Sequence, residues 1–324
     1  MSVLVIKQGA LGDVIMATAL IDAIVRGHPE SSVCLLTTPP FAGLFAAWPG
    51  LEVVSFPRKG WRAVASTLRW MRARRFRRVY DLQGNDRTAL LCALSGIPER
   101  VGSHTRFPYN LHPATRWDAQ SHVFLRLNAV LDAAGIAPAA PRPRLPCAAA
   151  ARDEVEAFMQ THALRRAGFV VMHAGASRTR QDKCWPGFEA LAQTLLAAGL
   201  AIVWLGGSDD RERNAALAAK LGIDATGRFS IPQLAALASH ARFAVTNDSG
   251  PMHACAAAGV PVFALFCPSD WRRNHALGQG ENVIAGVELL PDLYGLRTSD
   301  CLARITPEHV LTMIRARGLL NALP

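Results

Sequence analysis

The stretch NDSGPMH, residues 247–253, is the one around which the chain is organised. It follows an apolar run, Ala241–Thr246, and opens a second one, Ala254–Ala258, which predicts a strand, a tight turn and the first turn of a helix. Asp248 or Ser249 can cap such a helix, and proline suits its first positions. Bare backbone N–H groups at a helix terminus attract anions. We interpret the stretch as a seat for the diphosphate of a nucleotide-linked donor; the alternative is an ordinary capped helix.

Apolar strand-like runs alternate with helical patterns on both sides of this stretch, which predicts parallel sheets with β/α/β crossovers. The predicted strands of the first half are 3–7, 32–37, 52–56 and 78–82, and those of the second half include 169–173, 200–205 and 262–266. A segment with four prolines, 137–146, separates the halves and is typical of an extended linker. We therefore predict an α/β protein with two Rossmann-like domains, 1–146 and 147–324, the second ending in a helix at 306–317.

Composition and cysteine spacing favour a globular protein of a reducing compartment. Half of the 324 residues are apolar, and the first residues, 1–8, lack the pattern of a signal peptide. The longest apolar runs are too short to span a bilayer. Seven scattered cysteines form no CxxC pair, so neither a zinc site nor a disulfide framework is expected. These features predict a cytosolic protein.

The positive charge is concentrated in the first half. Residues 1–150 hold 18 Lys and Arg against 9 Asp and Glu, whereas residues 151–324 hold 17 against 16. The stretch 58–78 has nine basic residues and no acidic one, with Trp61, Trp70, Met71 and Phe76 interleaved. We interpret it as a face for acceptor phosphates or anionic lipid headgroups, and the alternative is a solvated helix face. No RNA-binding signature accompanies it, so no nucleic-acid partner is expected. The residues assigned to this face are Arg58, Lys59, Arg62, Arg72, Arg74 and Arg75.

Asp13 is the candidate general base. It follows the first predicted strand in Gly9-Ala-Leu-Gly-Asp13, so it lies in the first turn of a helix at the carboxyl end of that strand. Ligands of parallel sheets bind at such ends. A carboxylate there can accept a proton from a substrate hydroxyl, although it can also serve only as a helix cap. The pattern GxxGD lacks the spacing of the GxGxxG fingerprint, so no NAD site is expected.

Lys183 is the candidate cation for a departing diphosphate. It lies between the predicted strand 169–173 and a following helix, where its charge can neutralise phosphate oxygens. The alternative is an ordinary surface lysine. No cluster of carboxylates, histidines or cysteines has metal-ligand spacing, so neither a metal nor a cofactor is expected, and protein cations would replace Mg²⁺.

The order of these motifs resembles that of glycosyltransferase family 9, the ADP-heptose:lipopolysaccharide heptosyltransferases. The resemblance extends over nearly the whole chain. The motifs that carry it are Leu11-Gly-Asp-Val14, Tyr80-Asp-Leu-Gln-Gly84, Asp182-Lys-Cys-Trp-Pro186, residues 247–253, Cys301-Leu302 and Thr306-Pro-Glu308.

This resemblance implies a GT-B fold, in which two Rossmann-like domains face each other across a cleft. It also implies inverting, metal-independent transfer of heptose from ADP-L-glycero-β-D-manno-heptose, a nucleotide sugar. The acceptor would be the inner core of a lipopolysaccharide precursor, at a Kdo residue or an existing heptose. Similar enzymes work at the cytoplasmic face of the inner membrane, which implies a peripheral contact with an anionic membrane.

The site residues implied by the resemblance match positions of this chain one by one. Asp13 matches the general base, and Lys183 matches a lysine that stabilises the donor phosphates. Asp210 matches an acidic residue at the donor ribose, and Phe229 falls where a residue packs near the adenine. The donor-binding turn is matched by Asp248, Ser249, Gly250 and His253, and the candidate phosphate contacts in the loop before Lys183 are Ser177 and Thr179.

The sequence departs from the heptosyltransferase I type in two places. The loop from His173 to Lys183 is longer, and position 249 is Ser where that type commonly has Thr. The acceptor sugar, the hydroxyl that is attacked and the oligomeric state therefore stay open. Two other functions also stay open: a sugar-nucleotide epimerase of GT-B architecture, and a non-catalytic relative that binds nucleotide or lipid.

Overall fold

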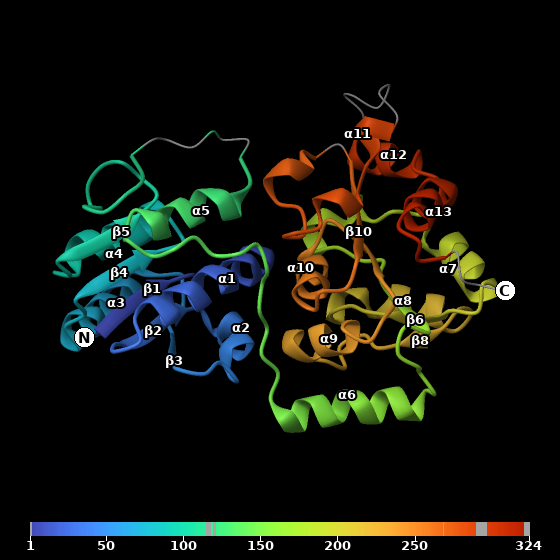
Figure 1. The fold of residues 1–324 in the computed structure, drawn as a ribbon, viewed down its shortest axis with the longest axis horizontal. Coiled ribbons are helices and arrows are strands. Elements are labelled where there is room, and N and C mark those ends of the chain that lie inside the picture. The colour runs from blue at the N-terminus through green and yellow to red at the C-terminus, as the bar shows by residue number, and fades with distance from the viewer. Residues whose placement is uncertain (1, 115–117, 119–120, 268, 290–296, 321–324) are drawn as a thin grey trace. The chain divides into compact units, whose positions relative to one another are not determined.

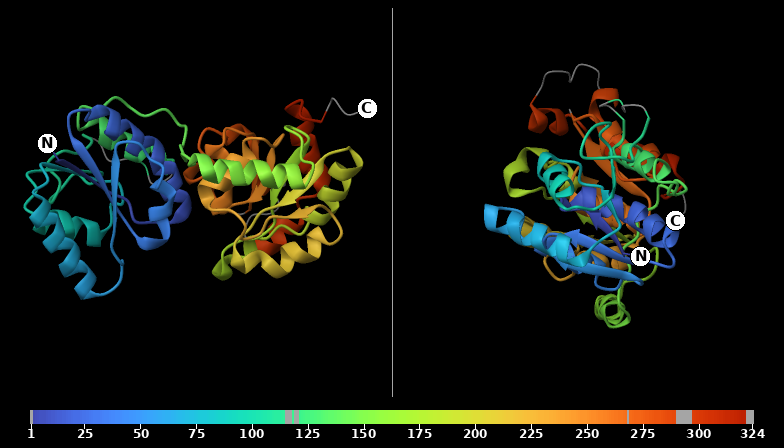
Figure 2. Two further views of the ribbon diagram at one scale, coloured as in Figure 1. Left: turned by 90° about the horizontal axis from the view of Figure 1, so that it is seen from below. Right: turned by 90° about the vertical axis from the view of Figure 1, so that its left-hand side faces the viewer.

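The chain divides into two compact units, Met1–Pro146 and Cys147–Pro324, and the boundary lies at the end of the proline-rich segment. A computed structural model describes residues 2–114, 118, 121–267, 269–289 and 297–320 (Figure 1). Each unit is a parallel sheet with helices on both faces (Figure 2), because β/α/β crossovers place the helices there. This arrangement confirms the α/β fold of two Rossmann-like units.

The amino-terminal unit has a five-stranded sheet in the order β3-β2-β1-β4-β5, with every described pairing parallel. Helices α1 and α5 contact each other, as do α3 and α4. Buried side chains of β1, β2 and β4 form a core with Met71 and Leu91, which lie on α3 and α4. The elements are β1 (Ser2–Ile6), α1 (Leu11–Gly27), β2 (Ser32–Thr37), α2 (Pro39–Ala42), η1 (Gly43–Phe45), β3 (Leu51–Ser55), α3 (Trp61–Arg74), β4 (Arg78–Asp81), α4 (Asp86–Leu94), β5 (Glu99–Gly102) and α5 (Val123–Asp132).

The carboxyl-terminal unit has a six-stranded sheet in the order β11-β10-β9-β6-β7-β8, also parallel in its described pairings. Its first half contains α6 (Ala149–Thr161), β6 (Phe169–His173), η2 (Arg178–Lys183), α7 (Phe188–Ala197), β7 (Ala201–Trp204), η3 (Ser208–Asp210), α8 (Arg211–Ala218) and β8 (Ile223–Asp224). Its second half contains α9 (Ile231–Ala238), β9 (Ala244–Asn247), α10 (Gly250–Ala257), β10 (Val262–Phe266), η4 (Trp271–Arg273), η5 (Gly280–Asn282), β11 (Val283–Ala285), α11 (Gly286–Leu289), α12 (Thr298–Ala303) and α13 (Pro307–Ala316).

Two layers of side chains cover the sheet of this second unit. Alternate residues of β6, among them Val170 and Met172, point into a core with residues of α7, α12 and α13. Helices α9 and α10 contact each other, and α9 also contacts α6. The described residues contain no helix that is both long enough and apolar enough to cross a membrane.

Strand β5, which precedes a long loop, is an element that the sequence analysis did not predict. Strand β5 ends at Gly102 and pairs with β4. A Cβ atom at Gly102 would collide with the ring of Tyr109, so the loop folds back tightly against this strand. Residues 115–117, 119 and 120 lie outside the described residues.

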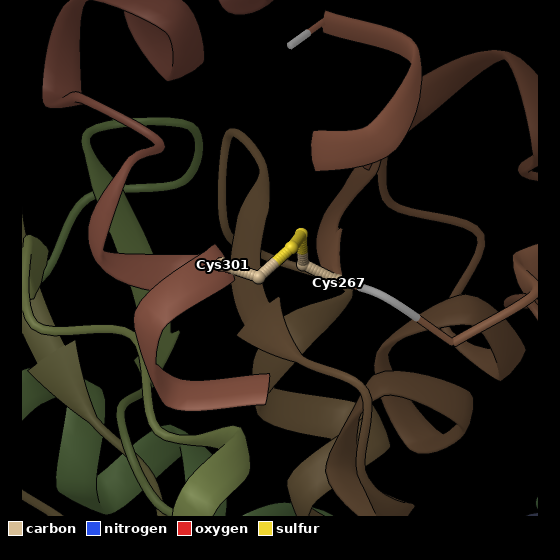
Figure 3. Close-up of a disulfide and its surroundings, with 2 residues drawn as sticks. All are labelled: Cys267 and Cys301. Carbon is tan, nitrogen blue, oxygen red and sulfur yellow. A yellow bond between two sulfur atoms is a disulfide. The ribbon is translucent and has the colours of Figure 1, made fainter. Parts of the chain in front are cut away.

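The structure corrects the expectation that the cysteines form no disulfide. Cys267, directly after β10, is joined to Cys301 in α12 (Figure 3), and their Cα atoms are 5.7 Å apart. Both residues belong to the core that includes α7 and α13. Their 34-residue separation in sequence gave no sign of the pairing, because the packing of α12 near the end of β10 brings them together.

Candidate active site

A pocket of about 600 Å³ lies at the carboxyl edge of the amino-terminal sheet, and Asp13 is among its lining residues. Its walls come from the residue after β1, the first turn of α1, the loops after β4 and β5, and α5. The carboxyl ends of parallel strands share one edge of a sheet, which explains why segments so distant in sequence meet here. Asp13 is half-buried and lies in the first turn of α1, as predicted.

Lys7 is a pocket residue that the sequence analysis missed. It is buried, and its ammonium group donates a hydrogen bond of 3.1 Å to the carbonyl oxygen of Leu82. Burial lowers the pKa of Lys7, and the negative charges of Asp13 and Asp81 offset part of this effect. The sequence did offer a signal for this pocket residue, because a lysine lies at the end of the first predicted strand, six positions before the candidate base.

Asp81 shapes the wall of the pocket from inside the protein. Its fully buried carboxylate accepts hydrogen bonds from the backbone N–H groups of Gln83 and Gly84, at 3.0 and 2.9 Å, and from the hydroxyl of Tyr109 at 2.6 Å. Gly84 has φ of +61°, a backbone conformation that favours glycine. The motif at residues 80–84 therefore builds a rigid loop beside Asp13.

The basic stretch of the amino-terminal unit divides into exposed and packed residues. Of the interleaved large side chains, Met71 and Phe76 are buried and Trp70 packs against Phe76 with ring centres 5.4 Å apart. Trp61 differs, because it is 75% exposed. The residues assigned to the anionic face are all exposed: Arg58, Lys59, Arg62, Arg72, Arg74 and Arg75.

The local contacts of these basic residues separate them into two groups. At the carboxyl end of α3, Arg74 forms an ion pair with Glu52, and Arg72 donates a 2.9 Å hydrogen bond to the carbonyl of Leu94. At the other end, the Arg62 guanidinium lies 5.5 Å from the ring centre of Trp61. The start of α3 therefore presents cations and an exposed aromatic ring together, a combination suited to a membrane interface.

The predicted donor turn lies in the carboxyl-terminal unit, at the carboxyl ends of β6 and β9. Asn247, the last residue of β9, is fully buried and joins two other segments. Its side-chain oxygen accepts a 3.1 Å hydrogen bond from the N–H of Trp185, and its amide nitrogen donates one of 2.9 Å to the carbonyl of Gly175. These bonds fix the loops after β6 and η2 against the start of α10.

Lys183 is placed beside this turn. Its ammonium group forms a hydrogen-bonded ion pair with the carboxylate of Asp248, and both side chains are mostly buried. Lys183 is the last residue of η2, so its position depends on the same loop that Asn247 holds. The lysine predicted for the donor phosphates therefore lies at the amino-terminal end of α10.

Ser249 and Gly250 mark the start of α10, as the sequence predicted. Ser249 occupies the N-cap position with extended backbone angles, and Gly250 is the first helical residue. The Ser249 hydroxyl lies 3.0 Å from Nδ1 of His173, the last residue of β6. His253, one turn into the helix, is buried. Ser177 and Thr179 are exposed in the segment around η2, where a ligand can reach them.

Asp210 and Phe229 lie in environments that the sequence did not reveal. The Asp210 carboxylate is buried; its Oδ2 accepts a 2.9 Å hydrogen bond from the N–H of Gly207 and lies 3.4 Å from Nε2 of His173. Burial alone would raise the pKa of Asp210, but the hydrogen bonds from His173 and from the N–H of Gly207 hold it below the usual range. The ribose contact expected of Asp210 stays a prediction, and its carboxylate has internal partners.

Phe229 packs edge-on against Phe158 of α6, with ring centres 5.1 Å apart. It also lines a pocket of about 690 Å³, together with Arg228 and Thr226. A half-buried aromatic ring that lines a pocket can stack on a planar base, so the predicted adenine contact is compatible with this position.

Within the described residues, no group of three or more His, Cys, Asp or Glu side chains is arranged to hold a metal ion. The polar groups instead form two sets. One surrounds Asp13 in the amino-terminal unit, and the other surrounds the start of α10. Two Rossmann-like units, one with a candidate base and one with a candidate anion site, are the architecture of the GT-B fold class.

Comparison with known proteins gives the family. Residues 64–292 match "Glycosyltransferase family 9 (heptosyltransferase)", and the chain belongs to this family. It is 24% identical over 344 residues to Lipopolysaccharide heptosyltransferase 2 of Escherichia coli K12, with 98% of each chain covered.

Solved structures show the same fold. A family 9 glycosyl transferase from Veillonella parvula has a TM-score of 0.81 at 23% identity, covering 99% of this chain and 97% of that one. The Escherichia coli heptosyltransferase WaaC with ADP has a TM-score of 0.73 at 20% identity, covering 98% and 99%.

Proposed function

We propose that this protein is an inverting lipopolysaccharide heptosyltransferase. It transfers heptose from ADP-L-glycero-β-D-manno-heptose to a Kdo or heptose residue of the inner core. Family membership supports the general activity. The observation that carries the proposal is the meeting of Lys183, Asp248 and Ser249 at the amino terminus of α10. Cations and backbone N–H groups together bind diphosphates, and the solved relative WaaC holds ADP.

The donor site would act mainly on the leaving group. When the glycosidic bond breaks, the departing ADP gains negative charge, and groups already oriented toward it stabilise the transition state more than the ground state. The Lys183 ammonium and the first-turn N–H groups of α10 can supply this stabilisation. The ion pair with Asp248 holds the Lys183 ammonium group in one orientation before the donor binds. Asp248 also neutralises part of the positive charge of the lysine.

The acceptor site would lie in the pocket of the amino-terminal unit. The hydroxyl oxygen of the acceptor attacks the anomeric carbon of the donor while Asp13 accepts the hydroxyl proton. The bond from the anomeric carbon to the diphosphate breaks on the opposite face. A single displacement of this kind inverts the anomeric configuration. Three basic residues, Lys7, Arg106 and Arg126, line the same pocket, and they suit an acceptor that bears a carboxylate or phosphates.

The protein's own cations would replace a metal ion in this proposal. Lys183 and the start of α10 carry the positive charge that Mg²⁺ supplies in other transferases. We also propose that the protein works at the cytoplasmic face of the inner membrane. The exposed group Arg58, Lys59, Trp61 and Arg62 supports a peripheral contact with anionic lipid, because it combines positive charge with an interfacial aromatic ring.

The test is ADP release from ADP-heptose by the purified protein, with and without a heptose-deficient core acceptor, in buffer with EDTA. We expect release only with the acceptor, and NMR of the product should show an inverted anomeric centre. Equal release without acceptor would favour an epimerase or hydrolase, and a requirement for added Mg²⁺ would contradict the metal-independent mechanism. A panel of truncated cores would then identify the acceptor sugar.

A further inference from the structure

His173 lies in the donor half of the molecule but has no assigned role in the proposed reaction. It is the last residue of β6 and is 3% exposed. Its two ring nitrogens face different partners: Nδ1 lies 3.0 Å from the Ser249 hydroxyl, and Nε2 lies 3.4 Å from the Asp210 carboxylate. The ring thus connects the N-cap residue of α10 to a buried acid from η3.

The Asp210 carboxylate determines which nitrogen of the ring carries the proton. A carboxylate accepts hydrogen bonds only, so Nε2, which faces it, carries the hydrogen. In the neutral ring Nδ1 is then an acceptor, and the Ser249 hydroxyl donates to it. The carboxylate is closely enclosed: a Cβ atom at Gly206 would approach its Oδ2 to 2.8 Å, and one at Gly175 would collide with its Oδ1.

Ser249 would ordinarily use its hydroxyl to cap the helix. A serine at the N-cap accepts a hydrogen bond from the N–H of the second or third helical residue. The second residue of α10 is Pro251, which has no N–H, so the target is the N–H of Met252. The Ser249 side chain makes no such bond in the described structure. Its hydroxyl lies instead 3.0 Å from Nδ1 of His173, and its O–H also has the carbonyl oxygen of Asn247, 3.2 Å away, as an acceptor.

We propose that His173 is a positioning residue that holds the Ser249 hydroxyl away from the start of α10, so that the N–H of Met252 stays available to the donor diphosphate. Asp210 acts through His173 by fixing its tautomer. This inference rests on the proposed function, because it takes the diphosphate to bind at α10. If the Ser249 hydroxyl capped the helix, it would occupy the N–H of Met252. One fewer N–H group would then be left to bind the anion.

The test is a set of calorimetric titrations with ADP on the wild type and four variants. His173→Phe keeps an aromatic ring but removes the acceptor, so Ser249 is free to turn and cap Met252. A cap contributes about 1 kcal/mol, so ADP should bind about fivefold more weakly. The double variant His173→Phe with Ser249→Ala has no hydroxyl to cap the helix, so ADP affinity should return to that of Ser249→Ala alone. His173→Asn places an amide oxygen near the Nδ1 position and should bind ADP about as tightly as the wild type.

The recovery in the double variant separates this role from a merely structural one. If His173→Phe only damaged the fold, removing the Ser249 hydroxyl would not restore binding. Equal ADP affinity of His173→Phe and wild type, or a double variant that binds ADP more weakly than Ser249→Ala alone, would overturn the inference while leaving the proposed function intact. A wild-type protein that binds no ADP would overturn both.

A measurement on the wild type keeps the inference testable even if His173→Phe fails to fold. Long-range ¹⁵N–¹H NMR of histidine-labelled protein should show His173 as the Nε2–H tautomer, with its signals assigned by comparison with His173→Asn. The Nδ1–H tautomer would overturn the inference. The ring would then donate to the Ser249 oxygen and would offer no acceptor for the Ser249 O–H.

Discussion

The ammonium group of Lys183 contacts the carboxylate of Asp248, a residue 65 positions further along the chain. Both side chains are mostly buried, so each reduces the cost of burying the other. The contact places a cation at the amino-terminal end of a helix, where the backbone is already favourable to anions. A diphosphate arriving there would meet a lysine that is already oriented.

Replacing Lys183 by alanine should therefore weaken donor binding and slow transfer together. The change removes the cation and leaves the Asp248 carboxylate unpaired near the diphosphate. We expect kcat/KM for ADP-heptose to fall on the order of 10²-fold, and ADP titration should show weaker binding. Lys220→Ala is the matched control, because Lys220 pairs with Glu189 on the exposed surface. Unchanged ADP affinity in Lys183→Ala would place the lysine away from the phosphates.

Replacing Asp13 by asparagine should remove the base but preserve the donor site. Asp13 and the proposed donor site lie in different units, so the ADP affinity of the variant should stay near that of the wild type. Turnover should fall by about 10² to 10⁴ because the acceptor hydroxyl loses its proton acceptor. Asp86→Asn is the control, since Asp86 is also an acid in the first turn of a helix of the same unit. Near-wild-type turnover in Asp13→Asn would contradict the assignment of the base.

The start of α3 should carry the membrane contact. Changing Arg58, Lys59 and Arg62 to glutamine should reduce binding to vesicles rich in anionic lipid by roughly 10²-fold. The binding that remains should be less sensitive to salt. A control variant with Arg152, Arg165 and Arg273 changed to glutamine removes the same charge from exposed positions in the other unit. If both variants bind vesicles equally well, the basic residues form only a solvated face.

Lys7 should make the stability of the protein depend on pH in the alkaline range. Burial lowers its pKa below the value of 10.5 expected in the unfolded chain. Between these two values the unfolded chain binds more protons than the folded protein, so stability rises with pH. The melting temperature of wild type relative to Lys7→Met should therefore increase as pH approaches 10.5. A constant or falling difference would show that the Lys7 ammonium is better stabilised in the fold than its burial indicates.

Reduction of the Cys267–Cys301 disulfide should destabilise the carboxyl-terminal unit. The bond closes a 34-residue separation, and disulfides of this kind contribute about 2–4 kcal/mol by restricting the unfolded chain. A reductant should therefore lower the melting temperature of the wild type but leave that of the double variant Cys267→Ser, Cys301→Ser unchanged. Intact mass after alkylation gives an independent check. If every cysteine of the unreduced protein is alkylated, the bond does not form in solution.

Periodicity and turn residues were sufficient to predict the architecture. The strands found at 32–37, 169–173 and 262–266 have the predicted bounds, because each is a continuous apolar run between turn signals. The strands that were missed, β5, β8 and β11, each lie at an edge of a sheet. They are short, and β5 and β8 include charged residues, so their sequences carry little strand signal. They become strands because they form hydrogen bonds with a neighbouring strand that is distant in sequence.

The sequence by itself determined the local parts of the candidate site. Asp13 is in the first turn of a helix and Ser249 is an N-cap because turn residues and helix periodicity act over a few neighbouring positions. Only the tertiary structure decided which of these parts meet. His173 reaches Ser249 across 76 positions because β6 and β9 are neighbours in one parallel sheet. Strand order follows from the packing of the whole unit, and no short stretch of sequence encodes it.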